Sequence, residues 1–464
     1  MNKRQSGLLA LAMLALASLL HSLVWYNIAA IPEGLLSGSR WAFMFLLCVY
    51  AWFRKTLTAW ILVSMVIGVL VGYEFPAFSQ QLVFLRQIFL NLVKVIVAPL
   101  LFATLVVGIA GHSNLKQVGR LGWKSILYFE IVTTIALVIG LLAINISQAG
   151  FGIDQPLTLE KLPETKALTW DQHIVDVFPS NFIKAILDGK VLQIVVFSVI
   201  FAISLALLKE EKKRPMVRAC ESLAETMFRF TNIIMYFAPI GIGAAMAVTV
   251  GHLGIGILEN LMKLVLTLYA ALIVFLFTVL LPVALMIRLP LKKFITAIRE
   301  PVSIAFATTS SDSALPKALE NMEKFGVPRK IVSFVIPTGY TFNLDGTTLY
   351  LSLASVFVAQ AAGIQMSIGQ QITMCLVLML TSKGVAAVPR ASLVILIATA
   401  DQFHLPLWPI AAIFGIDELM DMARTSVNVI GNTLASCVIA RWEGEFDDQK
   451  ALTFSEKEAD AIVG

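Results

Sequence analysis

Long apolar segments separated by short polar loops fill the first two thirds of the chain. Segments long enough to cross a bilayer as helices are predicted near residues 57–73, 82–109, 121–147, 186–208, 218–251 and 258–287. Two more apolar runs precede them, residues 7–31 and the shorter 41–53, and together they predict an extra N-terminal membrane hairpin. The first run exceeds the apolar region of a signal peptide. We therefore expect an all-α polytopic membrane protein.

The last third of the chain differs because runs of Ser, Thr, Gly and Pro interrupt its apolar segments. Residues 308–316 (TTSSDSALP) and 381–389 (TSKGVAAVP) each lie between two half-length apolar arms. Each is followed by a helix with polar residues, at 339–348 (GYTFNLDGTT) and 416–432 (IDELMDMARTSVNVIGN). Irregular backbone at membrane depth is tolerated only where it is buried in protein or lines a cavity. The pattern predicts a twofold repeat of a re-entrant hairpin and a helix around a midplane site.

The segment 405–442 carries a polar face inside an apolar helix. At about 100° per residue, one arc of about 100° holds Asp417, Asp421, Arg424, Thr425, Asn428 and Asn432. The opposite face is formed by Leu419, Met420, Met422, Val427 and Ile430. A charged residue at the centre of a membrane helix costs at least about 2.5–3.5 kcal/mol on insertion scales. This favours a ligand or ion site; a structural ion pair between Asp421 and Arg424 is the alternative.

The composition agrees with a membrane protein. Hydrophobic residues make up 58% and charged residues 14%, and the mean hydropathy is +0.83. The net charge of +5 fits basic cytoplasmic loops and gives no indication of nucleic-acid binding. The Lys- and Arg-rich loops, counted along the chain, predict that the N-terminus is inside. The four cysteines are scattered without a CxxC motif, so they predict neither a disulfide framework nor a zinc site.

The two interruptions before residue 350 offer different chemistry. Ser310 and Ser311 can present hydroxyl and backbone N–H groups to an anion, as helix N-termini do. Asn343 and Asp345 flank a point where Gly346 would let the helix unwind and turn carbonyl groups toward a cation. Asp312 beside the serines raises a membrane-embedded hydrolase as a minor alternative, but the chain has no G-x-S-x-G motif and no histidine in a comparable intramembrane context.

Four motifs in order carry a family resemblance: SSDSALP at 310–316, NLDGT at 343–347, SKGVAAVP at 382–389 and GIDELMDMARTSVNVIGN at 415–432. The chain resembles the dicarboxylate/amino acid:cation symporter family of glutamate transporters from about residue 57 to 443. The resemblance implies a glutamate-transporter fold with eight core transmembrane helices and two re-entrant helical hairpins, here with the extra N-terminal hairpin. It also implies a homotrimer whose mobile transport domains move past a scaffold like an elevator.

The resemblance divides the chain into four parts. Residues 1–54 form the extra membrane hairpin, which the resemblance does not cover, and 55–300 the first six core spans. Residues 301–442 form the transport core, and 443–464 a cytoplasmic tail. The implied protein is a multi-pass plasma-membrane protein, of the bacterial inner-membrane type, that contacts lipid and needs no cofactor beyond co-transported H⁺ and/or Na⁺.

The substrate residues follow from the resemblance position by position. Arg424 resembles the arginine that binds the side-chain carboxylate of the substrate, and its planar fork suits that group. Asp421 resembles the carboxylate that binds the α-amino group. The remaining substrate contacts would be Ser310, Ser311, Thr347, Val388, Pro389, Thr425 and Asn428, with Val388 and Pro389 in the hairpin that acts as the outer gate.

The cation residues depart from the sodium-coupled pattern. Asn343 and Asp345 are retained and, with Asn428, could hold sodium, but Asn432 stands where the family has an acidic sodium ligand. Val132 and Thr133 replace a Thr-Ser pair and so remove one hydroxyl. The list of cation-coupling candidates is Asn343, Asp345, Thr133, Glu130 and Asn432.

Glu130 lies within an apolar span, where burial favours the protonated carboxyl, so it is a candidate proton carrier. The alternative is a structural role near the inner end of its helix. The chain is therefore predicted to be a symporter for glutamate and aspartate, coupled to protons and/or sodium, and not an enzyme. A C4-dicarboxylate symporter on the same fold is the alternative, and Asp421 separates the two because a dicarboxylate has no amino group.

Overall fold

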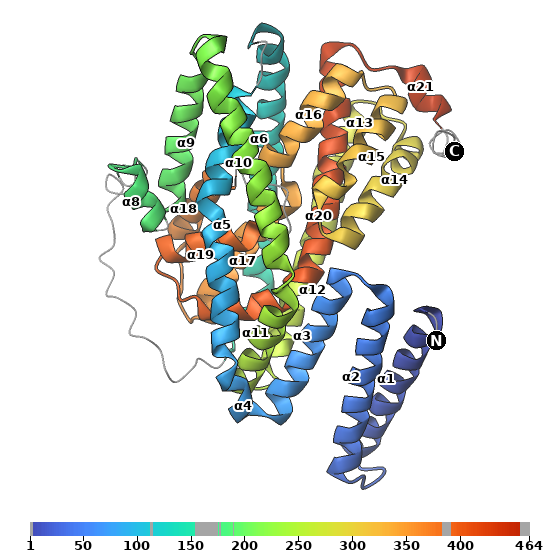
Figure 1. Cartoon of the computed structure of the whole chain (residues 1–464). Helices are drawn as coiled ribbons and strands as arrows, with labels where there is room; N and C mark the ends of the chain where they lie inside the picture. Colours follow the sequence, from blue (N-terminus) through green and yellow to red (C-terminus); the bar gives the residue numbers. More distant parts are fainter. Residues whose placement is uncertain are drawn as a thin grey trace. The chain divides into compact units, whose positions relative to one another are not determined.

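The computed structural model describes residues 3–111, 115–153, 175, 178–188, 190–382 and 391–454. These residues are mostly helical and contain no strand (Figure 1). The predicted all-α class is confirmed. The chain divides into two compact units. The first unit comprises Met1–Leu92, Ile233–Leu258 and Ala411–Glu418, and the second Val93–Asn232, Glu259–Ile410 and Leu419–Gly464.

Among the described residues, six helices are long and apolar enough to cross a membrane, or seven if α10 and α11 form one broken span. The six spans are Gln5–Trp25, Glu33–Arg54, Leu57–Glu74, Pro76–Ala110, Arg120–Ser147 and Ile257–Met286. The protein is therefore a multi-pass membrane protein by length and composition of its helices.

The first unit contains the N-terminal hairpin. Its helices are α1 (Lys3–Trp25), α2 (Glu33–Arg54), α3 (Leu57–Glu74), α4 (Pro76–Gln81), α11 (Ala238–Leu253) and the start of α5 (Val83–Ala110). α1 and α2 lie side by side, and α3 packs along α11 (Figure 1). The expected second arm, 41–53, was too short. Polar residues at the start of α2 interrupt the apolar run without ending the helix.

The second unit holds most of the remaining helices. They are α6 (Leu115–Ser147), α8 (Phe182–Leu187), α9 (Val191–Ala206), α10 (Glu210–Met235), α12 (Ile257–Phe275), the π-helical turn η1 (Leu276–Leu280), α13 (Leu281–Met286), α14 (Leu291–Thr308), α15 (Ser311–Lys324), α16 (Arg329–Phe342), α17 (Asp345–Ala361), α18 (Ile368–Thr381), α19 (Ala391–Gln402), α20 (Trp408–Glu443) and α21 (Asp448–Thr453). The single segment predicted at 218–251 is two helices, because the chain breaks between Met235 and Ala238.

The first interrupted segment is a turn between two antiparallel helices. α14 ends at Thr308, Thr309 adopts a left-handed conformation with φ of 53°, and Ser310 caps α15 by accepting a hydrogen bond from the Ser313 N–H at 3.4 Å. The Asn321 amide donates to the Ala297 carbonyl at 2.8 Å and joins the two arms. The predicted interruption is confirmed at Thr309 and Ser310, whereas residues 311–316 belong to α15.

The C-terminal segment packs against other helices of the second unit, to which it belongs. The Asp447 N–H donates to the Gly326 carbonyl at 3.0 Å, and the Lys293 ammonium donates to the Phe454 carbonyl at 2.9 Å. The Phe325 and Phe454 rings meet edge to face at 5.9 Å. The tail predicted from residue 443 is therefore attached up to Phe454 by contacts around the junction of α15 and α16.

Glu443 ends α20 and ties it to α6. Its carboxylate accepts hydrogen bonds from Lys124, at 2.6 Å, and from Arg120, and its side chain is only 2% exposed. Burial alone would raise the pKa of Glu443, but the two cations outweigh burial and hold that pKa below its usual value. A lowered carboxyl pKa stabilises the fold above the unfolded-state pKa, and the stabilisation is lost as the pH falls.

We therefore expect Glu443→Gln to lower the melting temperature of the detergent-solubilised protein at pH 7. The loss of unfolding free energy should be only about 1 kcal/mol, because Arg120 is mostly exposed. The difference from the unsubstituted protein should shrink as the pH falls below about 4. Glu445→Gln is the matched control, since the Glu445–Lys330 pair is more exposed. An equal loss of stability in Glu443→Gln at pH 7 and below about pH 4 would contradict the idea that the ionised Glu443 carboxylate provides this stability.

Candidate functional site

The polar face of α20 is buried. Its six predicted members, Asp417, Asp421, Arg424, Thr425, Asn428 and Asn432, are each at most 5% exposed. Asp417 belongs to the first unit and the other five to the second. Met420 and Val427 on the opposite face are buried as well, so that face packs against protein here.

Arg424 and Asp421 form an ion pair one turn apart. The Arg424 Nε–H donates to Asp421 Oδ1 at 2.9 Å, and the Thr425 hydroxyl donates to the same oxygen at 2.9 Å. The Arg424 guanidinium lies over the Tyr350 ring of α17, 4.2 Å from its centroid. A buried charge is tolerated only when it is paired and hydrogen-bonded. The ion pair between Asp421 and Arg424 that the structural alternative requires is therefore present. The same two side chains are also the groups that a substrate carboxylate and ammonium would contact.

Asn428 holds the start of α17 against α20. Its Oδ1 accepts from the N–H groups of Gly346, at 2.8 Å, and Thr347, at 3.3 Å, and its Nδ2 donates to the Thr347 hydroxyl at 2.9 Å. These N–H groups belong to the first turn of a helix, which needs an acceptor from outside that helix. A Cβ at Gly346 would clash with the Arg424 backbone, so glycine permits this approach.

The interruption before α17 lies at Asn343 and Leu344. The predicted break between Asn343 and Asp345 is confirmed, but Gly346 does not lie in the break, because it belongs to the first turn of α17, which begins at Asp345. An acidic residue is favourable at a helix N-terminus, where the dipole is positive. Gly346 instead serves the close contact with α20.

Asn343, Asp345 and Asn432 form a second polar cluster next to the first. The Asn343 amide donates to Asp345 Oδ2 at 3.3 Å, and the Asn432 amide donates to the carbonyls of Asn343, at 3.1 Å, and Asn428, at 2.9 Å. Asn343 and Asp345 are fully buried. A Cβ at Gly431 would clash with the Asp345 carboxylate. Carbonyl and carboxylate oxygens of this kind are ligands for hard cations.

Helix α6 packs against α16 and α17, the helices on either side of the break that holds Asn343. Thr133 is buried and its hydroxyl donates to the Phe129 carbonyl at 2.7 Å, while Glu130 is half-buried. A Cβ at Gly339 would clash with Asn432 and would lie 3.4 Å from the Phe129 ring, so the backbone of Gly339 lies between the two. Val132 is buried and offers no oxygen ligand.

Hydrogen bonds connect only some of the predicted site residues with one another. In the described part of the chain, hydrogen bonds connect the α20 residues to Asn343, Gly346 and Thr347, but none connects them to Ser310 or Ser311. Ser311 is buried and Ser310 half-buried at the N-terminus of α15. Val388 and Pro389 lie outside the described residues.

Tyr350 is a site residue that the sequence analysis missed. It is fully buried on α17, three residues after Thr347 and therefore on the same helix face. Its ring faces the Arg424 guanidinium and limits where that group can lie. The spacing from Thr347 was the available signal.

Residues 57–442 match the sodium:dicarboxylate symporter family, which covers the whole site. The chain belongs to this family. Residues 3–54, with α1 and α2, precede the matched region. The resemblance expected from the four motifs is thus confirmed.

Individual family members support the assignment. The chain is 44% identical to a proton/sodium-glutamate symport protein of Geobacillus stearothermophilus, over 86% of this chain and 98% of that protein. It is 42% identical to a proton/glutamate-aspartate symporter of Escherichia coli (strain K12), over 86% and 96%. It is 38% identical to a C4-dicarboxylate transport protein of Bacillus subtilis (strain 168), again over 86% and 96%.

Proposed function

We propose that this protein is a secondary active symporter of the plasma membrane that takes up glutamate and aspartate together with protons and/or sodium. The observation that carries the proposal is the buried pair of Arg424 and Asp421 on one face of α20. An acidic amino acid brings one carboxylate for the first and one ammonium for the second. The names of the most similar relatives above support the same substrate class.

The proposed binding step exchanges one ion pair for two. The side-chain carboxylate of the substrate takes a bidentate contact with the Arg424 fork, and its α-amino group takes the Asp421 carboxylate. Thr425, Asn428 and Thr347 contribute hydroxyl and amide groups around it. Ser310 and Ser311 would close the site from one hairpin and Val388 and Pro389 from the other.

The proposed architecture follows the family. The helix pairs α14–α15 and α18–α19 would be the two re-entrant hairpins, and α16–α17 and α20 the last two core helices, giving eight core spans. Each protomer of a homotrimer would carry substrate by an elevator-like movement of a transport domain. Transport without chemical change of the substrate means that the protein is not an enzyme.

A counterflow experiment tests the substrate class. Proteoliposomes loaded with unlabelled glutamate should accumulate external labelled glutamate, and aspartate should compete better than succinate or glutamine. Succinate preferred over both amino acids would favour the C4-dicarboxylate alternative, which the Bacillus subtilis relative represents. Asp421 would then be a structural partner of Arg424 only.

We further propose that coupling depends on protons, with at most a reduced set of sodium ions. Asn432 supplies an amide where the resemblance leads one to expect a carboxylate, so a cation there would lack one negative charge in a buried site. Val132 removes another oxygen. Asp345 and Glu130 are the carboxylates that could carry a proton, while Asn343, Asp345 and Asn428 could still hold one sodium ion.

Uptake under separately imposed gradients tests the coupling. An inward proton gradient should drive uptake without sodium. If Glu130 is the proton carrier, Glu130→Gln should reduce this proton-driven uptake at least tenfold, which corresponds to about 1.4 kcal/mol. Asn432→Asp should raise the sodium dependence of uptake. Asn145→Asp is its matched control, because it makes the same change on α6, far along the helix from Glu130. Strict dependence on sodium, with no response to protons and no effect of Glu130→Gln, would contradict the proposal.

A further inference from the structure

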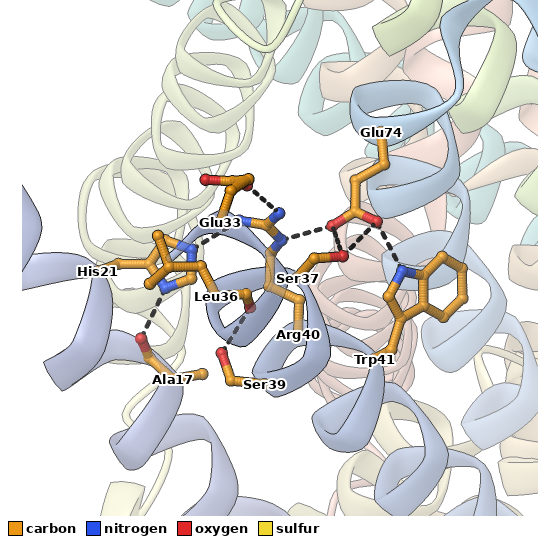
Figure 2. Close-up of polar contacts among 9 residues, drawn as sticks. All are labelled: Ala17, His21, Glu33, Leu36, Ser37, Ser39, Arg40, Trp41 and Glu74. Atoms are coloured by element: carbon orange, nitrogen blue, oxygen red, sulfur yellow. Dashed lines mark hydrogen bonds and ion pairs between the residues drawn. The ribbon is translucent and has the colours of Figure 1, made fainter. Parts of the chain in front are cut away.

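The N-terminal hairpin, which the family match leaves out, is attached to α3 by a polar cluster of the first unit. Figure 2 shows the Glu74 carboxylate of α3 facing α2, where it accepts hydrogen bonds from Ser37, from Arg40 Nε at 2.6 Å and from Trp41 Nε1 at 2.6 Å. The Glu74 side chain is 10% exposed and that of Arg40 17% exposed. The contacts tie the added helices to the first helix of the matched region.

Arg40 lies at the centre of this cluster and reaches all three helices. Its Nη2 donates to Glu33, also on α2, at 2.8 Å, and its Nη1 is 2.8 Å from Nε2 of His21 on α1. A guanidinium has donors only. His21 Nε2 must therefore be the acceptor in this contact.

The other ring nitrogen of His21 fixes the tautomer. His21 Nδ1 lies 2.7 Å from the Ala17 carbonyl one turn earlier in α1, and a carbonyl only accepts (Figure 2). Nδ1 therefore carries the proton and Nε2 carries none. The contacts of Figure 2 require a neutral His21.

A protonated imidazole has two N–H donors and a positive charge. Its Nε2–H would point at an Arg40 donor, so the contact between α1 and Arg40 would become a repulsion. The charged groups that face His21 are Arg40 and Glu33 from α2 and Glu74 from α3, and α1 contributes none nearby. Glu74 is engaged by Arg40, whereas the Glu33 side chain is 72% exposed and could accept from an imidazolium only after a rearrangement.

We propose that His21, Arg40 and Glu74 form a proton-sensitive latch that holds the end of α1 on α2 and α3 when His21 is neutral and releases it when His21 is protonated. Histidine is the side chain that ordinarily changes its charge between about pH 5 and pH 8. Glu74 and Trp41 remain joined in the released state, so α2 stays on α3. Only the end of α1 loosens.

Hydrogen exchange of the full-length protein in lipid nanodiscs tests the latch. His21→Gln keeps a neutral acceptor at every pH, and His21→Lys keeps a positive charge. Segment 23–30, which holds the end of α1 and the turn after it, and segment 33–41 have the same sequence in all variants, so comparison at equal pH cancels the intrinsic exchange rate. Segment 349–361 of the buried helix α17 is the internal control.

At pH 8 the unsubstituted protein should exchange like His21→Gln in both segments. At pH 5 segment 23–30 should exchange roughly fivefold faster in the unsubstituted protein than in His21→Gln, because the end of α1 opens locally, while segment 33–41 should not differ. His21→Lys should show the fast exchange at both pH values. Equal exchange of the unsubstituted protein and His21→Gln at pH 5 would overturn the proposal, whether or not His21→Lys folds and whatever the transported substrate is.

Discussion

Arg424→Ala is expected to abolish glutamate and aspartate uptake while the protein still inserts into the membrane. Arg424 is 1% exposed and paired with Asp421, so its removal takes away the substrate carboxylate contact and leaves a buried carboxylate without its cation. Breaking a buried pair typically costs about 3–5 kcal/mol. Affinity for aspartate should therefore fall by roughly two orders of magnitude or more.

Two variants sharpen this result. Arg424→Lys keeps the charge but loses the planar fork and the stacking on Tyr350, so it should recover little affinity. Arg441→Ala is the matched control, because Arg441 lies on the same helix but contacts Asp448, at 2.8 Å, and Phe446. Binding measured by isothermal titration decides, and undiminished aspartate affinity in Arg424→Ala would remove Arg424 from the site.

Asp421→Asn is expected to separate amino acids from dicarboxylates. If Asp421 binds the α-amino group, the substitution should weaken aspartate and glutamate by roughly 100-fold, as for the loss of one partner of a buried charge pair. Succinate has no amino group, and its carboxylates can still neutralise Arg424, so its affinity should change little. Competition in counterflow gives both values in one preparation.

The outcome for the two ligand classes decides the role of Asp421. Thr425→Val is the useful comparison, since it removes the other described donor to Asp421 Oδ1 without removing a charge. It should weaken aspartate less than Asp421→Asn does. Equal losses of aspartate and succinate in Asp421→Asn would mean that Asp421 only positions Arg424.

The sequence predicts well where local residue types decide the structure. The turn between α14 and α15 was predictable because Thr, Ser and Pro interrupt an apolar run, and Ser310 is a favourable helix cap. The polar face of α20 was predictable from its period alone. Its burial on both sides follows from packing that the period does not contain.

Long-range contacts account for what the sequence did not reveal. The polar residues Glu33, Ser37 and Arg40 made α2 look shorter in the sequence than it is. Their place in the helix could not be foreseen, because Glu74, which accepts from Ser37 and Arg40, is more than 30 residues away in the chain. The N–H of Gly346 in the first turn of α17 is bonded by Asn428, 82 residues away, so the role of Gly346 in this close contact could not be read from the local sequence. Tyr350 was missed because a tyrosine in an apolar helix is usually a packing residue.

Concentrative uptake by the purified protein tests the central proposal most directly. Proteoliposomes given an inward proton or sodium gradient should accumulate labelled glutamate above the external concentration, and the label should be recovered as intact glutamate. An ionophore that collapses the gradient should release it, and Arg424→Ala should show no accumulation. Failure to concentrate any acidic amino acid under either gradient, or recovery of a chemically altered product, would contradict a symporter of acidic amino acids.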